Sequence, residues 1–307
     1  SVTSIESFDG CTNLANITID PNNEYYSSEN GVLFNKTKSE LVRYPFGCPN
    51  PEYTIPNSVT KISEWAFYKC TKLTNITIPD NVESIGDRSF YDCSNLTNLT
   101  ISNNLRSIGD QAFSHCTSLK NITIPDSVTK IGDYAFEDCK SLTNITIPNK
   151  VTNFGNGTFY KCTSLTSISI PDRVSSIGYR AFEDCTSLSS ITIPKNVTNI
   201  GLSAFEGASS LTCITIPSKV TNIGFSAFEG TSSLTNITVD SNNEYYSSEN
   251  GILFNKDKSK LIIYPAANSR KEYTIPDSVT CLDVYAFSGC SNLSSITIPD
   301  RSEEHTS

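Results

Sequence analysis

The 307-residue sequence contains no methionine, one tryptophan and only two histidines. Basic residues are also scarce, with 23 Lys and Arg against 32 Asp and Glu and a formal net charge of −9. This balance argues against nucleic-acid binding, which needs a positive face for phosphates, and against attraction to anionic lipid. No apolar run is long enough to span a bilayer. Without an initiator methionine, we expect a fragment or a processed form, so the missing signal peptide says nothing about location.

What the sequence does have is an internal repeat of 23 residues. The unit is L-x-x-I-x-I-P-x-x-V-x-x-I-G-x-x-A-F-x-x-C-x-x. Its phenylalanines are Phe67, Phe90, Phe113, Phe136, Phe159, Phe182, Phe205 and Phe228. One unit is too small to bury its own Leu, Ile and Phe side chains. Successive units must therefore stack and cover one another, which predicts a solenoid.

The local structure of one unit follows from residue spacing. Residues 119–124 alternate apolar and polar positions and are rich in β-branched residues, which predicts a short strand ended by Pro125. Gly132 is interpreted as a bend, and Asp133 as the N-cap of one or two helical turns that begin with Ala135 and Phe136. The predicted fold class is therefore α/β, with about twelve parallel concave strands and short convex helical turns. The strands end at Ile19, Ile55, Ile78, Ile101, Ile124, Ile147, Ile170, Ile193, Ile216, Val239, Ile275 and Ile298.

The period is broken twice by a longer variant repeat. Phe8 and Phe67 are 59 residues apart, and so are Phe228 and Phe287, which leaves a 36-residue variant in each gap. The two variants, near residues 20–55 and 240–275, each contain two strand-like segments around a polar loop, which predicts a β-hairpin. We expect a single solenoid over residues 1–300. Residues 301–307 abandon the pattern and correspond to a common sequencing-adapter read, so we expect a non-native tail.

Eleven cysteines are present, and six occupy one column of the repeat. Ala208 and Thr231 fill the same column in later repeats, so the position accepts any small side chain. Buried free cysteine behaves in this way, which favours a ladder of free thiols. A disulfide between neighbouring turns is the alternative. The column is Cys70, Cys93, Cys116, Cys139, Cys162 and Cys185.

Residue combinations typical of catalytic and metal sites are missing. The sequence has no C-x-x-C pair, no glycine-rich phosphate loop and no nucleophile elbow. His115 precedes Cys116, but adjacent residues rarely converge as base and nucleophile, and no third group is placed to orient the imidazole. Asp92 and Asp138 share the column of His115, so an Asp–His–Asp stack is an alternative weak cation site. We predict no catalytic residue, no resident metal and no cofactor.

The repeat resembles that of the BspA-like leucine-rich-repeat family, also called the Treponema-type class. The resemblance covers residues 5–299, including the variant-repeat motif N-N-E-Y-Y at 22–26 and 242–246. The chain departs from the commonest leucine-rich repeat, which has a buried Asn or Cys after the strand. That position holds Asn81, Ser127, Lys150 or Arg173 here. The resemblance implies a right-handed solenoid and an extracellular or cell-surface adhesin.

Side chains between the buried strand positions form two polar columns, which we predict to be a concave binding face. Threonine also favours strands for structural reasons, so the columns have a structural interpretation as well. As a functional surface they would hydrogen-bond a repetitive ligand, with weak sites multiplied by avidity. The face lacks the aromatic residues that stack on sugars, which makes a protein ligand more plausible than a glycan. The residues are Asn75, Thr77, Asn98, Thr100, Asn121, Thr123, Asn144 and Thr146.

Two further surfaces are candidates. Later repeats replace the capping Asp with apolar residues, which predicts a convex contact stripe of Tyr179, Leu202 and Phe225. Alternatively, these side chains fold onto the next turn and join the core. The variant repeats carry amphipathic tyrosines that could anchor a partner or close the hairpin core. They are Tyr25, Tyr26, Tyr245 and Tyr246.

We therefore predict a non-enzymatic protein-binding or adhesion module that recognises matrix protein, a host cell or another microbial cell. The alternative is an intracellular, cytoplasmic scaffold that uses the same faces for protein partners. A glycan partner is possible but less favoured, and we expect no nucleic-acid partner and no direct membrane insertion.

Overall fold

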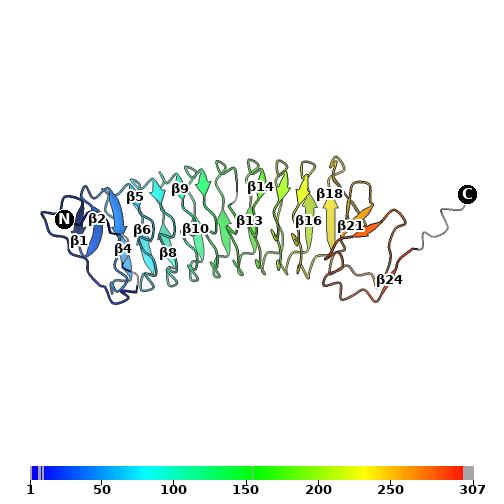
Figure 1. Cartoon of the computed structure of the whole chain (residues 1–307), viewed down its shortest axis with the longest axis horizontal. Coiled ribbons are helices and arrows are strands. Elements are labelled where there is room, and N and C mark those ends of the chain that lie inside the picture. The colour runs from blue at the N-terminus through cyan, green and yellow to red at the C-terminus, as the bar shows by residue number, and fades with distance from the viewer. Residues whose placement is uncertain (1, 6–7, 9, 154, 300–307) are drawn as a thin grey trace, which may run out of the picture.

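The computed structural model describes residues 2–5, 8, 10–153 and 155–299. The predicted tail at residues 301–307 lies outside this part of the chain. The repeats stack along one axis into an elongated, nearly straight body, with the two variant repeats toward its opposite ends (Figure 1). The predicted solenoid of stacked repeats is thus confirmed.

Most regular repeats contribute a three- or four-residue strand to a first row of parallel strands. Equivalent residues pair in register, with Asn121 opposite Asn144 and Thr123 opposite Thr146. Ten of the twelve expected positions are strands, whereas the segments before Ile19 and Ile193 have none. The row contains β4 (Glu52–Thr54), β6 (Asn75–Thr77), β8 (Asn98–Thr100), β10 (Asn121–Thr123), β12 (Asn144–Thr146), β13 (Ser167–Ser169), β16 (Cys213–Ile216), β18 (Asn236–Val239), β22 (Glu272–Thr274) and β24 (Ser295–Thr297).

A second row of two-residue parallel strands lies a few residues after the first-row position in most repeats, where we had predicted only a bend. The proline ends one ladder, but the V-x-x-I segment after it buries its Ile and pairs with the next turn. The second row contains β5 (Lys61–Ile62), β7 (Ser84–Ile85), β9 (Ser107–Ile108), β11 (Lys130–Ile131), β14 (Ser176–Ile177), β15 (Asn199–Ile200), β17 (Asn222–Ile223) and β23 (Cys281–Leu282).

The predicted short helical turns are wrong, because the described residues contain no helix and the fold is all-β. In the turn around Phe113, both Gln111 and His115 adopt left-handed backbone angles, with φ of 53° and 61°. Left-handed residues cannot continue a right-handed helix. The N–H groups of Gln111, Phe113 and His115 instead donate to carbonyls of the next turn at 2.7–2.8 Å. We call the three N–H groups at these positions of a repeat its turn amides.

Two residues assigned to the helical turn have other roles. The Asp110 carboxylate accepts a hydrogen bond from the N–H of Asp133 in the next turn, at 2.9 Å, so the aspartates link repeats and cap no helix. Gly132 is required by close approach, because a Cβ there would lie 2.3 Å from Asp110 Oδ1 and 2.5 Å from Asp110 N. Both features arise from the tight stacking of one turn on the next.

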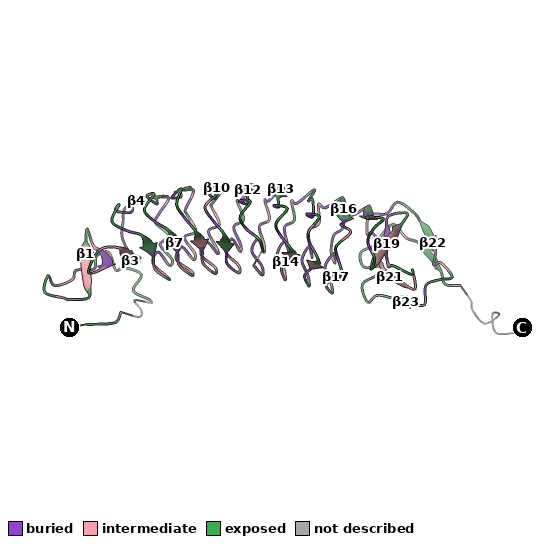
Figure 2. Cartoon of the chain, turned by 90° about the horizontal axis from the view of Figure 1, so that it is seen from above, coloured by how far each residue is buried: buried purple, intermediate pink, exposed green. Residues whose placement is uncertain are grey.

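The core is a continuous stack of phenylalanine rings. From Phe67 to Phe228, successive ring centroids lie 4.8–5.8 Å apart with interplanar angles of 4–13°. The predicted alignment of Phe90, Phe113 and Phe136 is therefore confirmed. Figure 2 shows the buried residues running along the inside of the stack.

The cysteine column lies beside the phenylalanines as free thiols. Each of five thiols donates a hydrogen bond to the carbonyl of the phenylalanine in the preceding turn, at 3.0–3.2 Å. Burial raises the pKa of these thiols, as for Cys139, so they stay protonated and unreactive at neutral pH. The donors are Cys93, Cys116, Cys139, Cys162 and Cys185.

Both variant repeats form the predicted hairpin, preceded by one strand that we had not predicted. The first comprises β1 (Tyr26–Glu29), β2 (Val32–Asn35) and β3 (Glu40–Arg43), and the second β19 (Tyr246–Glu249), β20 (Ile252–Asn255) and β21 (Lys260–Ile263). Neighbouring strands of each hairpin are antiparallel. β3 and β21 then continue the second row by pairing in parallel with β5 and β23.

Candidate functional site

The structure gathers the predicted concave residues on the outer side of the first row, and we call this surface the amide–hydroxyl face. Its Asn and Thr side chains point outward, while the residue between them is buried or half-buried. Asn98 Nδ2 donates to Asn75 Oδ1 at 2.8 Å, so part of the asparagine column bonds to itself. The face consists of Asn75, Thr77, Asn98, Thr100, Asn121, Thr123, Asn144 and Thr146.

The chemistry of this face is hydrogen bonding. Amides and hydroxyls recur at the spacing of adjacent strands, about 4.8 Å. Because the stack is nearly straight, the face is a broad surface and not the inside of a horseshoe (Figure 1). No titratable side chain lies in these two columns between Asn75 and Thr146. The arrangement can therefore bind an extended partner but offers no acid or base for proton transfer.

The predicted contact stripe is only partly exposed. Leu202 and Phe225 are 44% and 51% exposed, so neither joins the core. Tyr179 is half-buried beneath the guanidinium of Arg180, which lies 4.8 Å from its ring centroid. The contact role of the stripe stays a prediction.

The four hairpin tyrosines separate into two kinds. Tyr25 and Tyr245 are 47% and 51% exposed and are available for contact. Tyr26 and Tyr246 are half-buried, and the Tyr246 hydroxyl accepts a hydrogen bond from the N–H of Ile223 at 3.0 Å. Tyr246 therefore fastens the second variant repeat to the turn before it.

The Asp–His–Asp alternative brings only two of its three residues together. His115 Nδ1 lies 3.1 Å from Asp138 Oδ2, and the same oxygen lies 3.1 Å from Lys140 Nζ. The Tyr91 ring packs edge-on against the imidazole, with ring centroids 5.1 Å apart. Within the described residues, no group of three His, Cys, Asp or Glu side chains is placed to hold a metal ion.

Sequence reasoning missed a band of aromatic and basic side chains on the turns. Trp65 packs edge-on against Tyr68 at 4.8 Å, and the Arg88 guanidinium lies 4.8 Å from the Trp65 ring centroid. Tyr68 in turn packs against Tyr91. The repeat consensus does not show the band, because Ser114 replaces the tyrosine of this column in the next turn.

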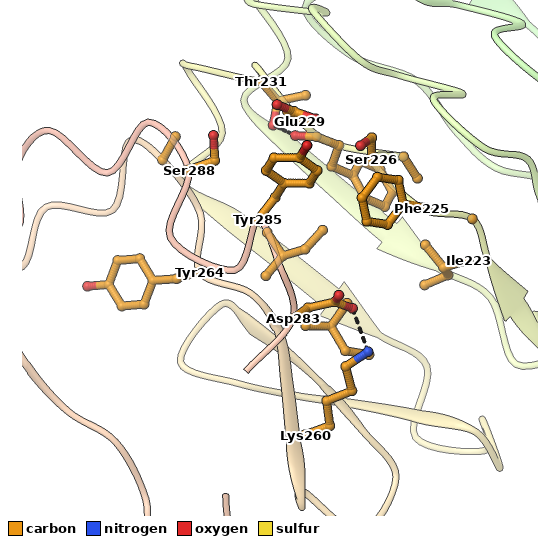
Figure 3. A pocket seen from close by; sticks show the side chains of 16 residues that line it. Ile223, Phe225, Ser226, Glu229, Thr231, Lys260, Tyr264, Asp283, Tyr285 and Ser288 are labelled. Atoms are coloured by element: carbon orange, nitrogen blue, oxygen red, sulfur yellow. Dashed lines mark hydrogen bonds and ion pairs between the residues drawn. The ribbon is translucent and has the colours of Figure 1, made fainter. Parts of the chain in front are cut away.

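A second missed feature is a cavity of about 270 Å³ where the second variant repeat joins the stack. We call it the variant-repeat cleft. Phe225 and Tyr285 pack against each other in its wall, with ring centroids 5.1 Å apart, and Lys260 pairs with Asp283 at 2.7 Å (Figure 3). Residues from three separate segments form the cleft, so a reading along the chain could not find it.

The repeat signature and the stacked fold lead to a family. The family model described as the BspA type leucine rich repeat region matches residues 44–166, 153–268 and 263–307 in six copies. The chain belongs to the BspA-type leucine-rich-repeat family. No curated protein matches this BspA-type chain.

Solved structures agree with this assignment. A leucine-rich cell surface protein from Faecalibacterium prausnitzii matches at 30% identity and a TM-score of 0.65, over 91% of this chain and 72% of its own. The leucine-rich-repeat protein of T. pallidum matches at 28% identity and a TM-score of 0.55, over 62% of this chain and 90% of its own. Across the described part of the BspA-type chain, no helix has the length and hydropathy needed to span a membrane.

Proposed function

We propose that this chain is a non-enzymatic adhesion module at the cell surface, which binds matrix protein, a host cell or another microbial cell. The observation that carries the proposal is the amide–hydroxyl face, where identical polar groups repeat in register over several turns. A similar protein from F. prausnitzii is named as a cell surface protein, which supports the location. Each repeat supplies one weak site, so affinity grows with the number of turns engaged.

One observation favours the alternative of an intracellular scaffold. All eleven cysteines are free thiols, including the exposed Cys11, Cys213 and Cys281. Free exposed thiols suit a reducing compartment better than an oxidising one. Protease treatment of intact cells separates the two: loss of the protein supports the surface location, and its survival supports the scaffold.

The binding surface is tested with matched charge substitutions in one repeat. Thr123→Glu places a carboxylate on the amide–hydroxyl face, whereas Thr129→Glu places the same group at an exposed position beside the second row. We expect Thr123→Glu to weaken adhesion to immobilised matrix proteins about tenfold, because it puts an unpaired charge at the contact. Thr129→Glu should adhere like the wild type. Equal adhesion of both variants would remove the face from the proposal.

A further inference from the structure

The backbone ladder between turns is incomplete where the second variant repeat joins the stack. In seven successive repeats, all three turn amides donate to carbonyls of the next turn, ending with Ser203, Phe205 and Gly207. The equivalent N–H groups of the following turn belong to Ser226, Phe228 and Gly230. None of these three finds a hydrogen-bond acceptor among the described residues. Phe228 is buried, Ser226 is half-buried and Gly230 is exposed. A buried backbone N–H group is rarely left unpaired, which makes Phe228 unusual.

The gap arises from the path of the second variant repeat. After β21, the chain makes other bonds: Tyr264 donates to the carbonyl of Ala286, and Ala267 donates to that of Leu234. The variant repeat therefore joins the turns on both sides of it without presenting carbonyls to Ser226 and Phe228. The space left over is the variant-repeat cleft, which both residues line.

The walls of the cleft combine apolar rings with polar groups. Phe225 is 51% exposed and Tyr285 is 41% exposed, so both rings offer surface to an incoming group. Figure 3 shows these two rings turned toward each other, with Tyr264 pointing away from them. At about 270 Å³ the cavity is near the lower limit for ligand pockets. Its size suits a side chain with a short stretch of backbone.

Charge decides what kind of acceptor the unpaired N–H groups can meet. Glu229 and Asp283 line the cleft, and its one basic residue, Lys260, is already paired with Asp283. The whole chain carries a net charge of −9. An anion would be repelled here, whereas a neutral carbonyl oxygen would not. Peptide carbonyls are the acceptors that the turn amides meet in every earlier turn.

We propose that the variant-repeat cleft binds a short peptide segment of a protein partner. Carbonyl oxygens of the segment accept hydrogen bonds from the N–H groups of Ser226 and Phe228, completing the ladder as an additional turn would. An apolar side chain of the segment packs against Phe225 and Tyr285. The inference rests on the proposed protein-binding function but uses a site separate from the amide–hydroxyl face.

The chain itself offers a matched control for the test. Leu202 occupies the position of Phe225 one repeat earlier and is similarly exposed, but the turn amides beside it are fully paired. Peptides are selected from a displayed random heptapeptide library on the whole chain, and their affinities for Phe225→Ala, Tyr285→Ala and Leu202→Ala are measured. We expect a loss of about tenfold for the first two variants and less than twofold for the third.

Hydrogen exchange of the bound complex gives a second readout that does not depend on substitution. The amides of Ser226 and Phe228 should exchange fast in the free chain and at least tenfold more slowly with the selected peptide. The amide of Phe205, already paired, should not change.

The proposal would be overturned by failure to select any peptide, by equal losses of affinity in all three variants, or by unaltered exchange at Ser226 and Phe228. Binding of glycans alone on a glycan array would also overturn it. Thr123→Glu should bind the peptide normally, so failure of the adhesion face would not mimic failure of the cleft.

Discussion

At the scale of single residues, most consensus positions of the repeat need their residue type because one turn lies so close to the next. Gly132 has no room for a Cβ, Asp110 bonds the backbone of the following repeat, and Cys139 satisfies the carbonyl of Phe113. Each of these residue types acts across a repeat boundary.

Replacing Gly132 with alanine should therefore destabilise the chain. The added Cβ would meet the backbone N of Asp110 at 2.5 Å, and backbone cannot move aside as a flexible side chain can. We expect a loss of roughly 1–3 kcal/mol, the usual cost of overpacking. Urea denaturation followed by circular dichroism measures it, with the exposed Thr129→Ala as control. An unchanged urea midpoint for Gly132→Ala would contradict the close-approach argument.

The cysteine ladder predicts how stability depends on pH. Burial raises the pKa of the Cys116, Cys139 and Cys162 thiols above the ordinary value of 9.0. Because the unfolded chain ionises first, the stability from each thiol is complete below about pH 9 and decreases as pH rises above it. Each thiol adds about 1.4 kcal/mol per pH unit to this decrease.

Cys139→Ala removes the contribution of one thiol to this pH dependence. The variant should fold, since Ala208 shows that the column accepts alanine. Its unfolding free energy should fall less steeply above pH 9 than that of the wild type, in urea titrations at several pH values. Parallel slopes for the two proteins would show that the thiol is not protected from ionisation in the folded state.

At the scale of the repeat, the turn around each phenylalanine from Phe67 to Phe205 is not helical, and its N–H groups form a ladder of hydrogen bonds between repeats. In the turn around Phe113, Gln111 and His115 take left-handed angles, and the N–H groups pair with the next turn. The phenylalanine at the centre of each turn is then held in register with its neighbours. The conformation of the turn is therefore fixed by its contacts with the neighbouring repeats.

Phe136→Ala should break the ring stack at one turn. The side chain is fully buried between Phe113 and Phe159, so truncation leaves a cavity and costs about 3–5 kcal/mol. In a solenoid the loss acts mainly on adjacent repeats. Hydrogen exchange should rise in β10 and β12 but little in β6. A uniform rise along the chain would mean that the repeats unfold as one unit.

At the scale of the molecule, the second variant repeat divides the core. One apolar cluster extends from Val32 to Leu253, and a smaller one surrounds Phe254, Tyr264 and Tyr273. The variant-repeat cleft lies at this division. Apolar side chains such as Val284 and Ile298 beyond it are largely exposed.

We therefore expect the segment after β21 to open before the rest. Fewer buried contacts give a lower free energy of local opening. Amides of β22 and β24 should exchange faster than those of β6 and β10 in native-state hydrogen exchange. Equal protection in both groups would show that the two clusters unfold together.

The solenoid, the phenylalanine stack, the hairpins and the amide–hydroxyl face were predictable, because a fixed period places the same residue in the same environment in every turn. The helical turn was mispredicted, because Asp-x-Ala-Phe suits a capped helix locally and only the neighbouring turn offers better hydrogen-bond partners. The aromatic band and the cleft depend on residues that depart from the consensus.

The sequence alone thus determined that the repeats stack, and which side chains they bury, since no single repeat can shield its own apolar face. Only the tertiary structure decided where the backbone ladder stops. That depends on the path of a hairpin whose N–H and C=O groups pair elsewhere, so that the amides of Ser226 and Phe228 meet no acceptor in the part of the chain that the structure describes.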